Sequence, residues 1–493
     1  MALSTFIGRE RELQILDQLW RSDRAELMIL YGRRRVGKTR LITNWIQISG
    51  VRALYWVADP TSSLDQLRSF SQVLFNLENA EAAPENFTYA SWKQAFSQLG
   101  RLAQKERLAV ALDEFTYLLA VEPGIAGVLQ NIWDQTLSQY NLLLILSGSH
   151  IGMMERNILS YQAPLYGRAT AKLLLPPLPF AATRHFFPRY HPDERVAVYA
   201  MLGGIPAYWE QFKPQSSLDT NIREQFLGGI NLLHDEARLL LQDFVSEIHN
   251  YVAIMKAIAN GFRTPKEIAS NAGLAEKHIS MYLRTLVTSG FVERRIPVTD
   301  SETSRSGRHY IVDPFLRFHF RFLSRRQMQI TLEIQDQALE EMKRHLVDFI
   351  GTYTWEELCR EWLLRASGQG RLPFLPDQIG EIWKKVVQVD VAGVNFMEKT
   401  LILGECKWGR HPMDWDILSG LVEKTNKVVP SEGEWRVFYL GFARQGWNIA
   451  ARQYAEQVAS GKLHGTNWRA VGMQLLDLEQ VDQNLNAWTA LSA

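Results

Sequence analysis

The chain has 493 residues, of which 46% are hydrophobic and 22% are charged, and its formal net charge is +1. The length predicts three or four compact domains, and a neutral total neither favours nor excludes a nucleic-acid partner. No hydrophobic run approaches the ~20 residues that span a bilayer, the first residues lack the layout of a signal peptide, and two cysteines are too few for a disulfide framework or a zinc site. We therefore expect a soluble, cytoplasmic protein that does not enter a membrane.

A phosphate-binding loop follows the first predicted strand, residues 27–31. Its spacing is G-x-x-x-x-G-K-[ST], and an apolar helical pattern follows from Leu41. The two glycines let backbone N–H groups fold around phosphates, Lys38 reaches the β- and γ-oxygens, and Thr39 holds Mg²⁺. The pattern predicts a site for ATP with Mg²⁺ rather than a chance glycine-rich turn. The expected nucleotide contacts in this loop are Gly32, Arg33, Arg34, Arg35, Val36, Gly37, Lys38, Thr39 and Arg40.

Two acidic residues end the next strongly apolar strand, residues 108–112. Asp113 is expected in the Mg²⁺ shell and Glu114 as the base that orients the attacking water, because phosphoryl transfer needs mainly positioning and charge neutralisation. The alternative, a strand end with solvated acids, is weaker after a phosphate loop. A further strand over 142–146 leads to Ser149, which is expected to touch the γ-phosphate or the water.

These strands, with one more over 51–57, alternate with helical stretches. The alternation predicts a mostly parallel sheet covered by helices on both faces, with the nucleotide at the carboxyl ends of the strands.

Three segments resemble the archaeal-type AAA+/STAND ATPases: Phe6-Ile7-Gly8-Arg9-Glu10, the phosphate loop, and Gly203-Gly204-Ile205-Pro206. The resemblance implies that Ile7, Gly8 and Arg9 border the nucleotide base and that Pro206 lies in a helical lid. It also nominates Arg168 as a charge-stabilising arginine. Whether Arg168 acts in its own subunit, acts in a neighbour of a homo-oligomer, or forms a structural salt bridge stays open.

A winged helix is predicted between the lid and the C-terminal third. The first helix covers 252–259, and a second begins at Thr264-Pro265-Lys266-Glu267 with a capping box. A third covers about 276–289, and a hairpin pairs 292–295 with 309–312. This layout places one helix in a major groove and the wing on phosphates. The expected DNA-facing residues are Lys277, His278, Ser280 and Arg284 on the helix and Arg294, Arg295, Arg305 and Arg308 on the wing.

The winged helix also has a second interpretation, as a module for packing or protein contacts only. The segment 313–318 after it matches the resembled family and is expected to dock the wing onto a following helix through its aromatic residues.

The C-terminal third holds a second chemical pattern. A strand over 386–391, a turn over 392–400 and a strand over 401–408 are predicted to form a hairpin. Glu405 and Lys407 are two residues apart and so point to one face. If Asp390 points the same way, two carboxylates can bind Mg²⁺ while the lysine orients water or stabilises charge on a scissile phosphate. This is the D-x(n)-[DE]-x-K arrangement of restriction-endonuclease-like nucleases.

The resembled family carries such a C-terminal domain of unknown function. Its helix motif matches Trp355-Glu356-Glu357-Leu358-Cys359 and nominates Glu356 as a further acid of the metal site. The family's acid two residues before the aspartate is Gln388 here, which leaves metal affinity and cleavage open.

The predicted fold is α/β multidomain: a P-loop parallel-sheet ATPase with a helical lid, a winged helix-turn-helix and a C-terminal restriction-endonuclease-like α/β domain. The expected bounds are 1–175 for the ATPase core, 176–245 for the lid, 246–312 for the winged helix, 313–345 for a helical connector and 346–493 for the nuclease-like domain. We expect an ATP-driven switch whose winged helix and nuclease-like domain act on DNA. The alternative is a regulatory STAND-type ATPase whose C-terminal domain binds nucleic acid or protein without cleavage.

Overall fold

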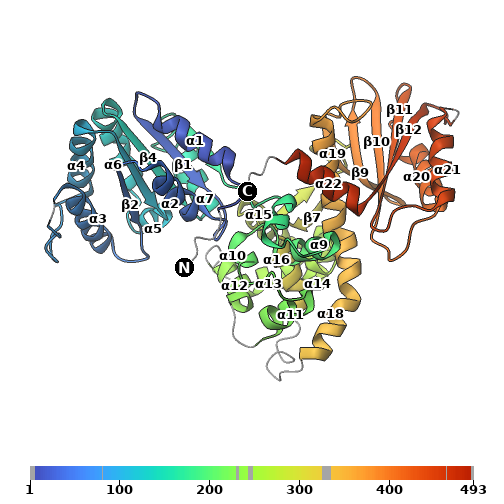
Figure 1. Ribbon diagram of the computed structural model, residues 1–493, viewed down its shortest axis with the longest axis horizontal. Coiled ribbons are helices and arrows are strands. Elements are labelled where there is room, and N and C mark those ends of the chain that lie inside the picture. The colour runs from blue at the N-terminus through green and yellow to red at the C-terminus, as the bar shows by residue number, and fades with distance from the viewer. Residues whose placement is uncertain are drawn as a thin grey trace. The chain divides into compact units, whose positions relative to one another are not determined.

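The computed structural model describes residues 6–79, 81–228, 232–242, 248–324, 335–461 and 463–489. The chain forms two compact units (Figure 1). The first holds the residues up to Leu178 together with Ile205–Ala207, and the second holds Pro179–Gly204 and the chain from Tyr208 onward. None of the helices in the described ranges combines the length and hydrophobicity needed to span a bilayer.

The first unit contains a five-stranded sheet in the order β2-β3-β4-β1-β5, with every neighbouring pair parallel. The strands are β1 Glu26–Tyr31, β2 Ala53–Val57, β3 Leu108–Asp113, β4 Leu142–Gly148 and β5 Ala171–Leu174. Every residue of β3 and β4 is buried, which explains their continuous apolar sequences. The predicted parallel sheet is confirmed. The short edge strand β5 was not predicted because its four residues alternate in exposure and lie beside a loop-rich segment.

Helices cover both faces of this sheet. They are α1 Glu10–Trp20, α2 Lys38–Ser49, α3 Ser63–Glu78, α4 Trp92–Lys105, α5 Phe115–Val121, α6 Ile125–Gln135, η1 Leu137–Gln139, α7 Ile151–Met154 and η2 Glu155–Leu159. Helices α3, α4 and α6 lie on one face, where they share a hydrophobic core with β1 to β4, and α1 and α2 lie on the other (Figure 1). The alternation of the strand side chains between these two faces decides which of them enter the core and which reach the phosphate-loop side.

The second unit begins with short helices in the region predicted as the lid. They are η3 Phe180–Ala182, α8 Thr183–Phe186, α9 Pro192–Leu202, α10 Pro206–Trp209, α11 Leu218–Ile222, η4 Arg223–Leu227 and α12 Leu232–Gln242, with the start of α10 grouped in the first unit. Gly203 ends α9 with φ +60°, and a Cβ there would lie 3.2 Å from the Pro314 ring, so glycine suits this position.

The winged helix is confirmed. It consists of α13 Ile248–Ala259, α14 Pro265–Ala272, α15 Glu276–Thr288 and the antiparallel pair β6 Val292–Arg295 and β7 Arg308–Ile311. The predicted capping box is present, because the Thr264 side chain accepts from the Glu267 N–H and the Glu267 carboxylate accepts from the Thr264 N–H.

Aromatic residues after the wing join the lid region to the next long helix. The connecting helices are α16 Pro314–Phe318, η5 His319–Leu323, α18 Gln335–Phe349 and η6 Ile350–Trp355. Phe315 packs on Tyr208 and Phe318 packs on Phe226, with ring centroids 4.9 Å apart in both pairs. Phe322 packs on Phe349 at 5.2 Å. The aromatic segment therefore docks onto a following helix, as expected, and also onto the lid helices.

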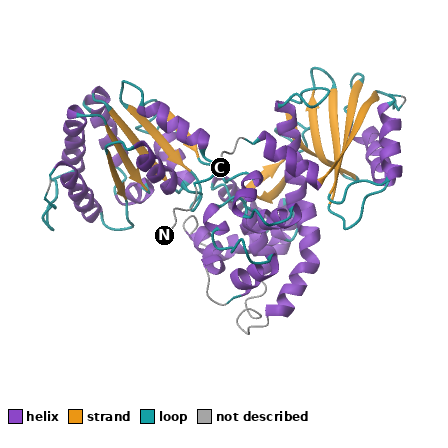
Figure 2. Cartoon of the chain, viewed as in Figure 1, coloured by secondary structure: helices purple, strands orange, loops and turns teal. Residues whose placement is uncertain are grey.

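The C-terminal domain is built on a mixed sheet in the order β12-β11-β10-β9-β8. Its elements are α19 Glu356–Gly368, β8 Gln378–Lys384, β9 Val387–Asn395, β10 Thr400–Lys407, α20 Trp415–Val428, β11 Trp435–Ala443, α21 Ile449–Ala459, β12 Trp468–Asp477 and α22 Leu478–Trp488. Strands β8 to β10 are antiparallel, and β10 to β12 are parallel through crossover helices α20 and α21. Figure 2 shows the strands of this sheet in orange and the flanking helices in purple. The predicted C-terminal α/β domain is confirmed as a separate domain with a mixed sheet, and its likeness to restriction endonucleases stays a prediction.

One boundary in this domain was predicted wrongly. The turn expected over 392–400 is shorter, because β9 continues to Asn395 and its last residues pair with both β8 and β10. Ala392 and Gly393 look like turn residues, but a Cβ on Gly393 would lie 3.1 Å from Pro376, so the glycine allows close packing inside a central strand.

A buried ion pair holds the C-terminal helix α22 against α9. Arg195 donates to both carboxylate oxygens of Asp482 at 2.8 and 2.7 Å, and the two side chains are 4% and 1% exposed. Such a pair in low dielectric fixes one relative placement of the two helices.

Candidate functional sites

The phosphate loop encloses the ammonium group of Lys38. Its Nζ donates to the carbonyl oxygens of Gly32 at 3.0 Å and Arg33 at 3.2 Å, and to Ser149 Oγ at 2.9 Å. Burial lowers the pKa of Lys38, and the nearby carboxylates of Glu114 and Asp113 oppose that shift. A cation held inside a backbone loop at the amino end of α2 is an arrangement that suits phosphate.

The acids predicted for the ATPase site lie beside this lysine. Asp113 Oδ2 accepts from Thr39 Oγ1 at 2.5 Å, Asp113 Oδ1 accepts from the Glu114 N–H at 2.9 Å, and Glu114 Oε1 accepts from Ser149 Oγ. The structure thus brings together Lys38, Thr39, Asp113, Glu114 and Ser149. A hydroxyl and a carboxylate from the ends of two elements form a hard-oxygen donor set that fits Mg²⁺.

Glu114 has a strained backbone. Its φ of 50° and ψ of 37° lie in the left-handed region, which costs a non-glycine residue roughly 1–2 kcal/mol. This conformation stops β3 abruptly and turns the Glu114 side chain toward Ser149 at the carboxyl edge of the sheet.

Sequence analysis missed Tyr55. Its hydroxyl donates to Asp113 Oδ2 at 2.8 Å, from β2 beside β3. Burial, and then the charge of Asp113, raises the pKa of Tyr55. The strand over 51–57 was visible in the sequence, but no local signal indicates that it is the neighbour of β3.

The amino-terminal segment braces the loop. Arg9 is 5% exposed, and its guanidinium donates to the carbonyl oxygens of Val36 at 3.2 Å and Pro176 at 2.8 Å. Ile7 and Gly8 are half-buried beside it, and Gly8 has φ +73°. The expected contact of this segment with a nucleotide base stays a prediction.

The other residues that are predicted to contact the nucleotide lie in the first unit. Gly37 precedes α2 with φ +103°, and Arg35 has φ +66°. Arg34 is exposed, Arg40 is half-buried, and Pro206 begins α10.

Arg168 lies near the end of β1 opposite to the phosphate loop. The N–H of nearby Thr170 donates to the Leu27 carbonyl oxygen near the start of β1, whereas the phosphate loop follows Tyr31, about 13 Å further along the strand. Arg168 forms a bidentate pair with Asp134, with its Nη2 2.7 Å and its Nε 2.9 Å from the carboxylate oxygens. The structure therefore contains the salt bridge, and a role for Arg168 at a nucleotide, in its own subunit or in a neighbour, stays a prediction.

The sheet of the C-terminal domain brings the second set of acids together. Strands β9 and β10 pair Gly404 with Val391, and continuing this register by one residue sets Glu405 opposite Asp390. Residues directly opposite in an antiparallel pair share a face. Asp390 Oδ2 accepts from the Cys406 N–H at 3.0 Å, so the carboxylate bends over β10.

Two lysines neutralise Glu405, which is 7% exposed. Lys407 Nζ is 2.6 Å from Oε1, and Lys424 Nζ, from α20, is 2.7 Å from Oε2. Lys424 was missed because it lies on a helix after the motif. The only local signal is that Lys424 flanks the buried stripe of that helix at Leu421 and Thr425.

Glu356 joins the same pocket from α19. The pocket has a volume of about 340 Å³, and its walls include Glu356, Asp390, Lys407 and Trp408. Burial, then the charge of Asp390, raises the pKa of Glu356 well above its ordinary value. Arg360 sits 3.5 Å from Glu356 and donates to the Asp390 carbonyl oxygen at 2.8 Å.

The donor set for a metal here is small. Across the described ranges, no group of three or more His, Cys, Asp or Glu side chains is arranged to hold a metal ion. Asp390 and Glu405 are two hard carboxylates on one face, so a cation at this site would take further oxygen ligands from water or substrate.

The wing turns toward the C-terminal domain. Arg295 pairs with two carboxylates, since its Nη2 is 3.3 Å from Glu357 Oε1 and its Nη1 is 3.3 Å from Glu381 Oε1. Arg308 donates to Gln388 at 3.2 Å. Trp383 Nε1 donates to the Ser306 carbonyl oxygen. For these arginines the structure favours the packing interpretation of the wing. Gln388, which stands where the resembled family has an acid, is therefore hydrogen-bonded to Arg308 of the wing.

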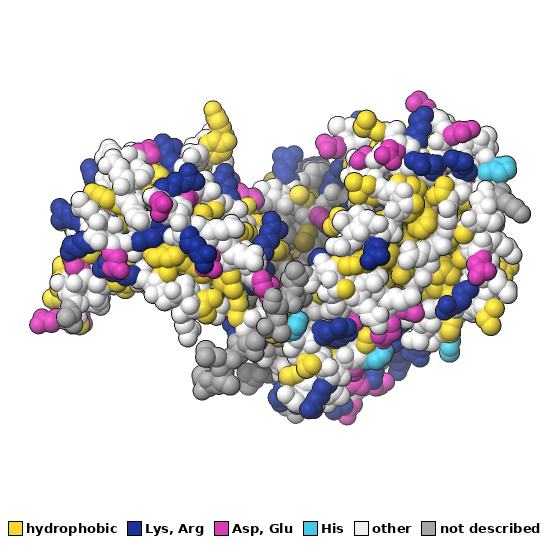
Figure 3. Space-filling view, turned by 45° about the horizontal axis from the view of Figure 1, so that its top comes forward, with side chains coloured by type: hydrophobic (Ala, Val, Ile, Leu, Met, Phe, Trp, Pro, Cys, Tyr) yellow, Lys and Arg dark blue, Asp and Glu magenta, His cyan; other side chains and the backbone are white. Residues whose placement is uncertain are grey.

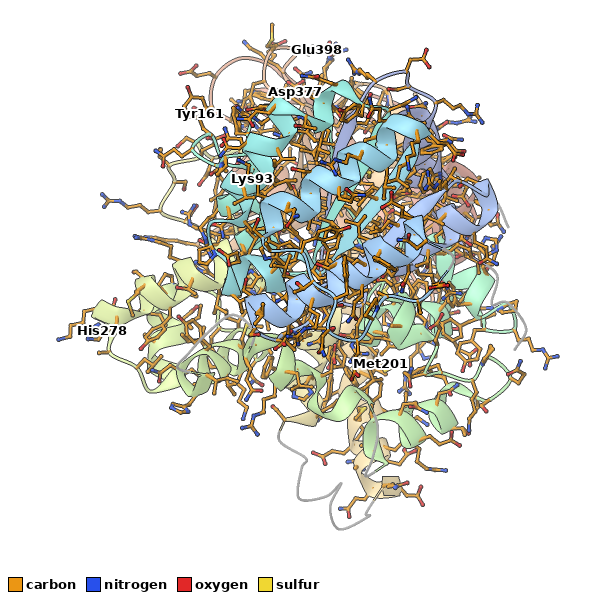
Figure 4. The ribbon with its side chains drawn as sticks, turned by 90° about the vertical axis from the view of Figure 1, so that its left-hand side faces the viewer. Lys93, Tyr161, Met201, His278, Asp377 and Glu398 are labelled. Carbon is orange, nitrogen blue, oxygen red and sulfur yellow. The ribbon has the colours of Figure 1, made fainter. Side chains whose placement is uncertain are left out.

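The outer face of α15 is exposed. Lys277, His278, Ser280 and Arg284 all lie on it, and His278 extends away from the winged helix (Figure 4). Basic and acidic side chains are interspersed over the face seen in Figure 3, in line with the net charge of +1. On the winged helix, these four side chains of α15 are exposed, whereas Arg295 and Arg308 of the wing contact residues of the C-terminal domain.

The electrostatics of Asp390 give a test of the site. Burial, and then the charge of Glu405, raises the pKa of Asp390 to about 6. Because this folded-state pKa lies above the ordinary value of 3.8, the charged carboxylate destabilises the fold, and stability is lost as pH rises from about 4 to 6. We expect Asp390→Asn to be more stable than the parent by on the order of 2–3 kcal/mol at pH 7.5 and equal to it near pH 4, measured by thermal unfolding in EDTA. Glu434→Gln, an exposed carboxylate of the same domain, is the control, and an equal gain for Asp390→Asn at both pH values would contradict the prediction.

Comparisons with known proteins agree with this geometry. Residues 6–212 match a family model described as an ATPase domain predominantly from Archaea, and residues 319–418 match one described as archaeal and bacterial proteins of unknown function. An uncharacterized protein of Methanocaldococcus jannaschii is 32% identical over 406 residues, which are 82% of this chain and 87% of that protein. An uncharacterized ATP-binding protein of the same organism is 50% identical over 42 residues, which are 8% of this chain and 71% of that protein.

The comparison with solved structures gives partial similarity. The Walker-type ATPase of Pyrococcus abyssi has a TM-score of 0.49 and 19% identity, over 64% of this chain and 96% of that one. The Orc1 protein of Aeropyrum pernix, in complex with DNA, has a TM-score of 0.35 and 14% identity, over 66% of this chain and 95% of that one. The match to the Methanocaldococcus jannaschii relative, together with both family models, establishes that this chain belongs to the archaeal-type P-loop ATPase family whose members carry this C-terminal domain of unknown function.

Proposed function

We propose that this ATPase is a switch that couples ATP binding and hydrolysis to a metal-dependent phosphodiesterase site acting on DNA. The phosphodiesterase part of this proposal rests on the register of β9 and β10, which sets Asp390 opposite Glu405. Lys407 lines the same pocket as Asp390. The lid helices, winged helix and C-terminal domain group in one unit, apart from most of the ATPase core. A change in the nucleotide would therefore act on these three modules together.

The ATPase half would use the residues gathered around the phosphate loop. Lys38 would move from the loop carbonyls to the β- and γ-phosphate oxygens, Thr39 and Asp113 would hold Mg²⁺, and Glu114 would orient the attacking water and accept its proton. Bound Mg²⁺ neutralises charge on the phosphates. Ser149 links Lys38 to Glu114 by hydrogen bonds, so it can report the presence of the γ-phosphate to the base.

The nuclease half is built on the carboxylate pair and two lysines. Asp390 and Glu405 would hold Mg²⁺, which supplies a nucleophilic water and stabilises charge on the phosphate. Lys407 lines the pocket and lies within reach of a phosphate oxygen or the water, and Lys424 balances Glu405 from its other side. Glu356, whose pKa burial and then the charge of Asp390 raise well above its ordinary value, lines the pocket beside Asp390.

A second candidate function has an observation in its favour. Both oxygens of Glu405 are engaged by lysines, and Gln388 stands where the family has an acid. This charge balance suits a domain that binds a phosphodiester backbone or an acidic partner without cutting it, as in a regulatory STAND-type ATPase.

The ATPase assignment is tested by two substitutions. Lys38→Ala should abolish nucleotide binding because the phosphate charge loses its counterion. Glu114→Gln should keep ATP bound while turnover falls on the order of 100-fold, because the metal shell stays but the base is lost. Single-turnover hydrolysis and retention of radiolabelled ATP measure both effects. Glu122→Gln on the same unit is the control, and a Glu114→Gln protein that hydrolyses ATP at the parent rate would rule out this role.

DNA binding through α15 is tested by salt dependence. Replacing Lys277 and Arg284 with Ala should weaken duplex binding. It should also reduce the slope of log affinity against log salt concentration by up to about 2, because the loss of two phosphate contacts means that fewer counterions are released on binding. Fluorescence anisotropy over 50–200 mM salt measures the slope. Lys93→Ala with Arg101→Ala on α4 removes the same charge elsewhere. An unchanged slope, or no binding at low salt, would favour the packing interpretation for the whole module.

Cleavage is tested with plasmid, single-stranded and branched DNA, with Mg²⁺ or Mn²⁺ and with or without ATP. The parent should cut at least one of these, and Asp390→Asn or Lys407→Ala should lose at least about 100-fold of the rate, because metal binding and charge stabilisation are removed. Glu398→Gln in the β9–β10 hairpin should cut like the parent. If the parent cuts nothing, the binding function above is favoured, and Gln388→Glu then tests whether the missing acid is the defect.

A further inference from the structure

We propose that Tyr55 is a positioning residue of the ATPase site, whose hydroxyl holds the Asp113 carboxylate in the orientation that accepts the metal–nucleotide complex. No residue of β2 belongs to either of the motifs that define the site, so this role extends the set of residues on which hydrolysis depends.

The sheet register places Tyr55 on the correct face. Strand β2 pairs in parallel with β3, with Tyr55 beside Ala111 and Val57 beside Asp113. Leu54 and Trp56 point into the hydrophobic core, so the alternate residues Tyr55 and Val57 face the side on which Asp113 lies. The small side chain of Ala111 beside Tyr55 leaves room for the phenol ring to lean toward Asp113, and the hydroxyl reaches Oδ2 at 2.8 Å.

The hydrogen bonds of Asp113 show why this contact matters. Asp113 is 1% exposed, so water cannot replace a missing donor at its carboxylate. Oδ1 is engaged by the Glu114 N–H, and Oδ2 is shared by the hydroxyls of Thr39 and Tyr55. Thr39 must turn its oxygen toward Mg²⁺ when the nucleotide binds. Tyr55 is then the side chain that keeps Oδ2 in place.

A purely structural tyrosine would behave differently. Replacement of Tyr55 by Phe retains the ring and its packing and removes only the hydroxyl. A structural role would change nucleotide binding equally with and without Mg²⁺. A positioning role acts through Asp113, and so it changes only the part of the binding that depends on the metal.

The experiment compares the full-length parent with Tyr55→Phe and Tyr140→Phe. Tyr140 is half-buried just before β4, at the opposite edge of the sheet from the phosphate loop, which makes it a matched control. Binding of fluorescent ADP is measured by titration in EDTA and again over a range of Mg²⁺ concentrations, and the kcat and KM for ATP are measured at saturating and limiting Mg²⁺.

We expect Tyr55→Phe to bind ADP like the parent in EDTA and to need about tenfold more Mg²⁺ for half-maximal enhancement, since a hydrogen bond to a buried carboxylate is lost. Its kcat should fall at limiting Mg²⁺ and recover at high Mg²⁺, while Tyr140→Phe matches the parent throughout. A Mg²⁺ midpoint within twofold of the parent would overturn the proposal. So would a loss of ADP binding of equal size with and without Mg²⁺, which is the result of a folding defect.

Discussion

The arrangement of the second unit depends on the half-buried carboxylate of Glu357. It accepts from Arg317 Nη1 at 2.9 Å and Nη2 at 3.0 Å, and from Arg295 Nη2 at 3.3 Å. Burial acts to raise the pKa of Glu357, but the two guanidinium groups outweigh it, and the pKa lies below its ordinary value. One carboxylate thus joins the wing, the connector helix α16 and the first helix of the C-terminal domain. Removing Glu357 would leave the buried Arg317 guanidinium without this partner, so the ion pair favours one arrangement of the three elements.

Two functional consequences follow from this ion-pair cluster. It orients α19, and because Glu356 is the adjacent residue, the same pairing directs Glu356 into the pocket with Asp390. It also commits Arg295 to contacts inside the protein, with its guanidinium 4.3 Å from the centroid of the Tyr310 ring. The outer face of the third helix, α15, is exposed.

The two candidate sites handle carboxylate charge in different ways. Asp113 accepts three hydrogen bonds, from Thr39, Tyr55 and the Glu114 N–H, and a buried cation, Lys38, lies close to it. Asp390 accepts from one backbone N–H, and burial, followed by the charge of Glu405, disfavours its charged form. The carboxylate of the ATPase site therefore has several donors to its charged form, whereas the carboxylate of the C-terminal site is electrostatically strained.

Local sequence determined the elements with strong patterns. The phosphate loop, the apolar strands β3 and β4, and the capped helices of the winged helix follow from glycine spacing, continuous hydrophobic runs and a capping box, all of which act over a few residues. For the same reason Lys38, Thr39, Asp113, Glu114 and the pair Glu405 and Lys407 could be nominated. The tertiary structure alone decided which strands are neighbours and which helices face a strand. Tyr55 and Lys424 join their sites across such contacts, and Arg168 and Arg295 pair with Asp134 and Glu357 through them. No local pattern encodes these pairings, because they arise from long-range packing and from ion pairs between residues far apart in the chain.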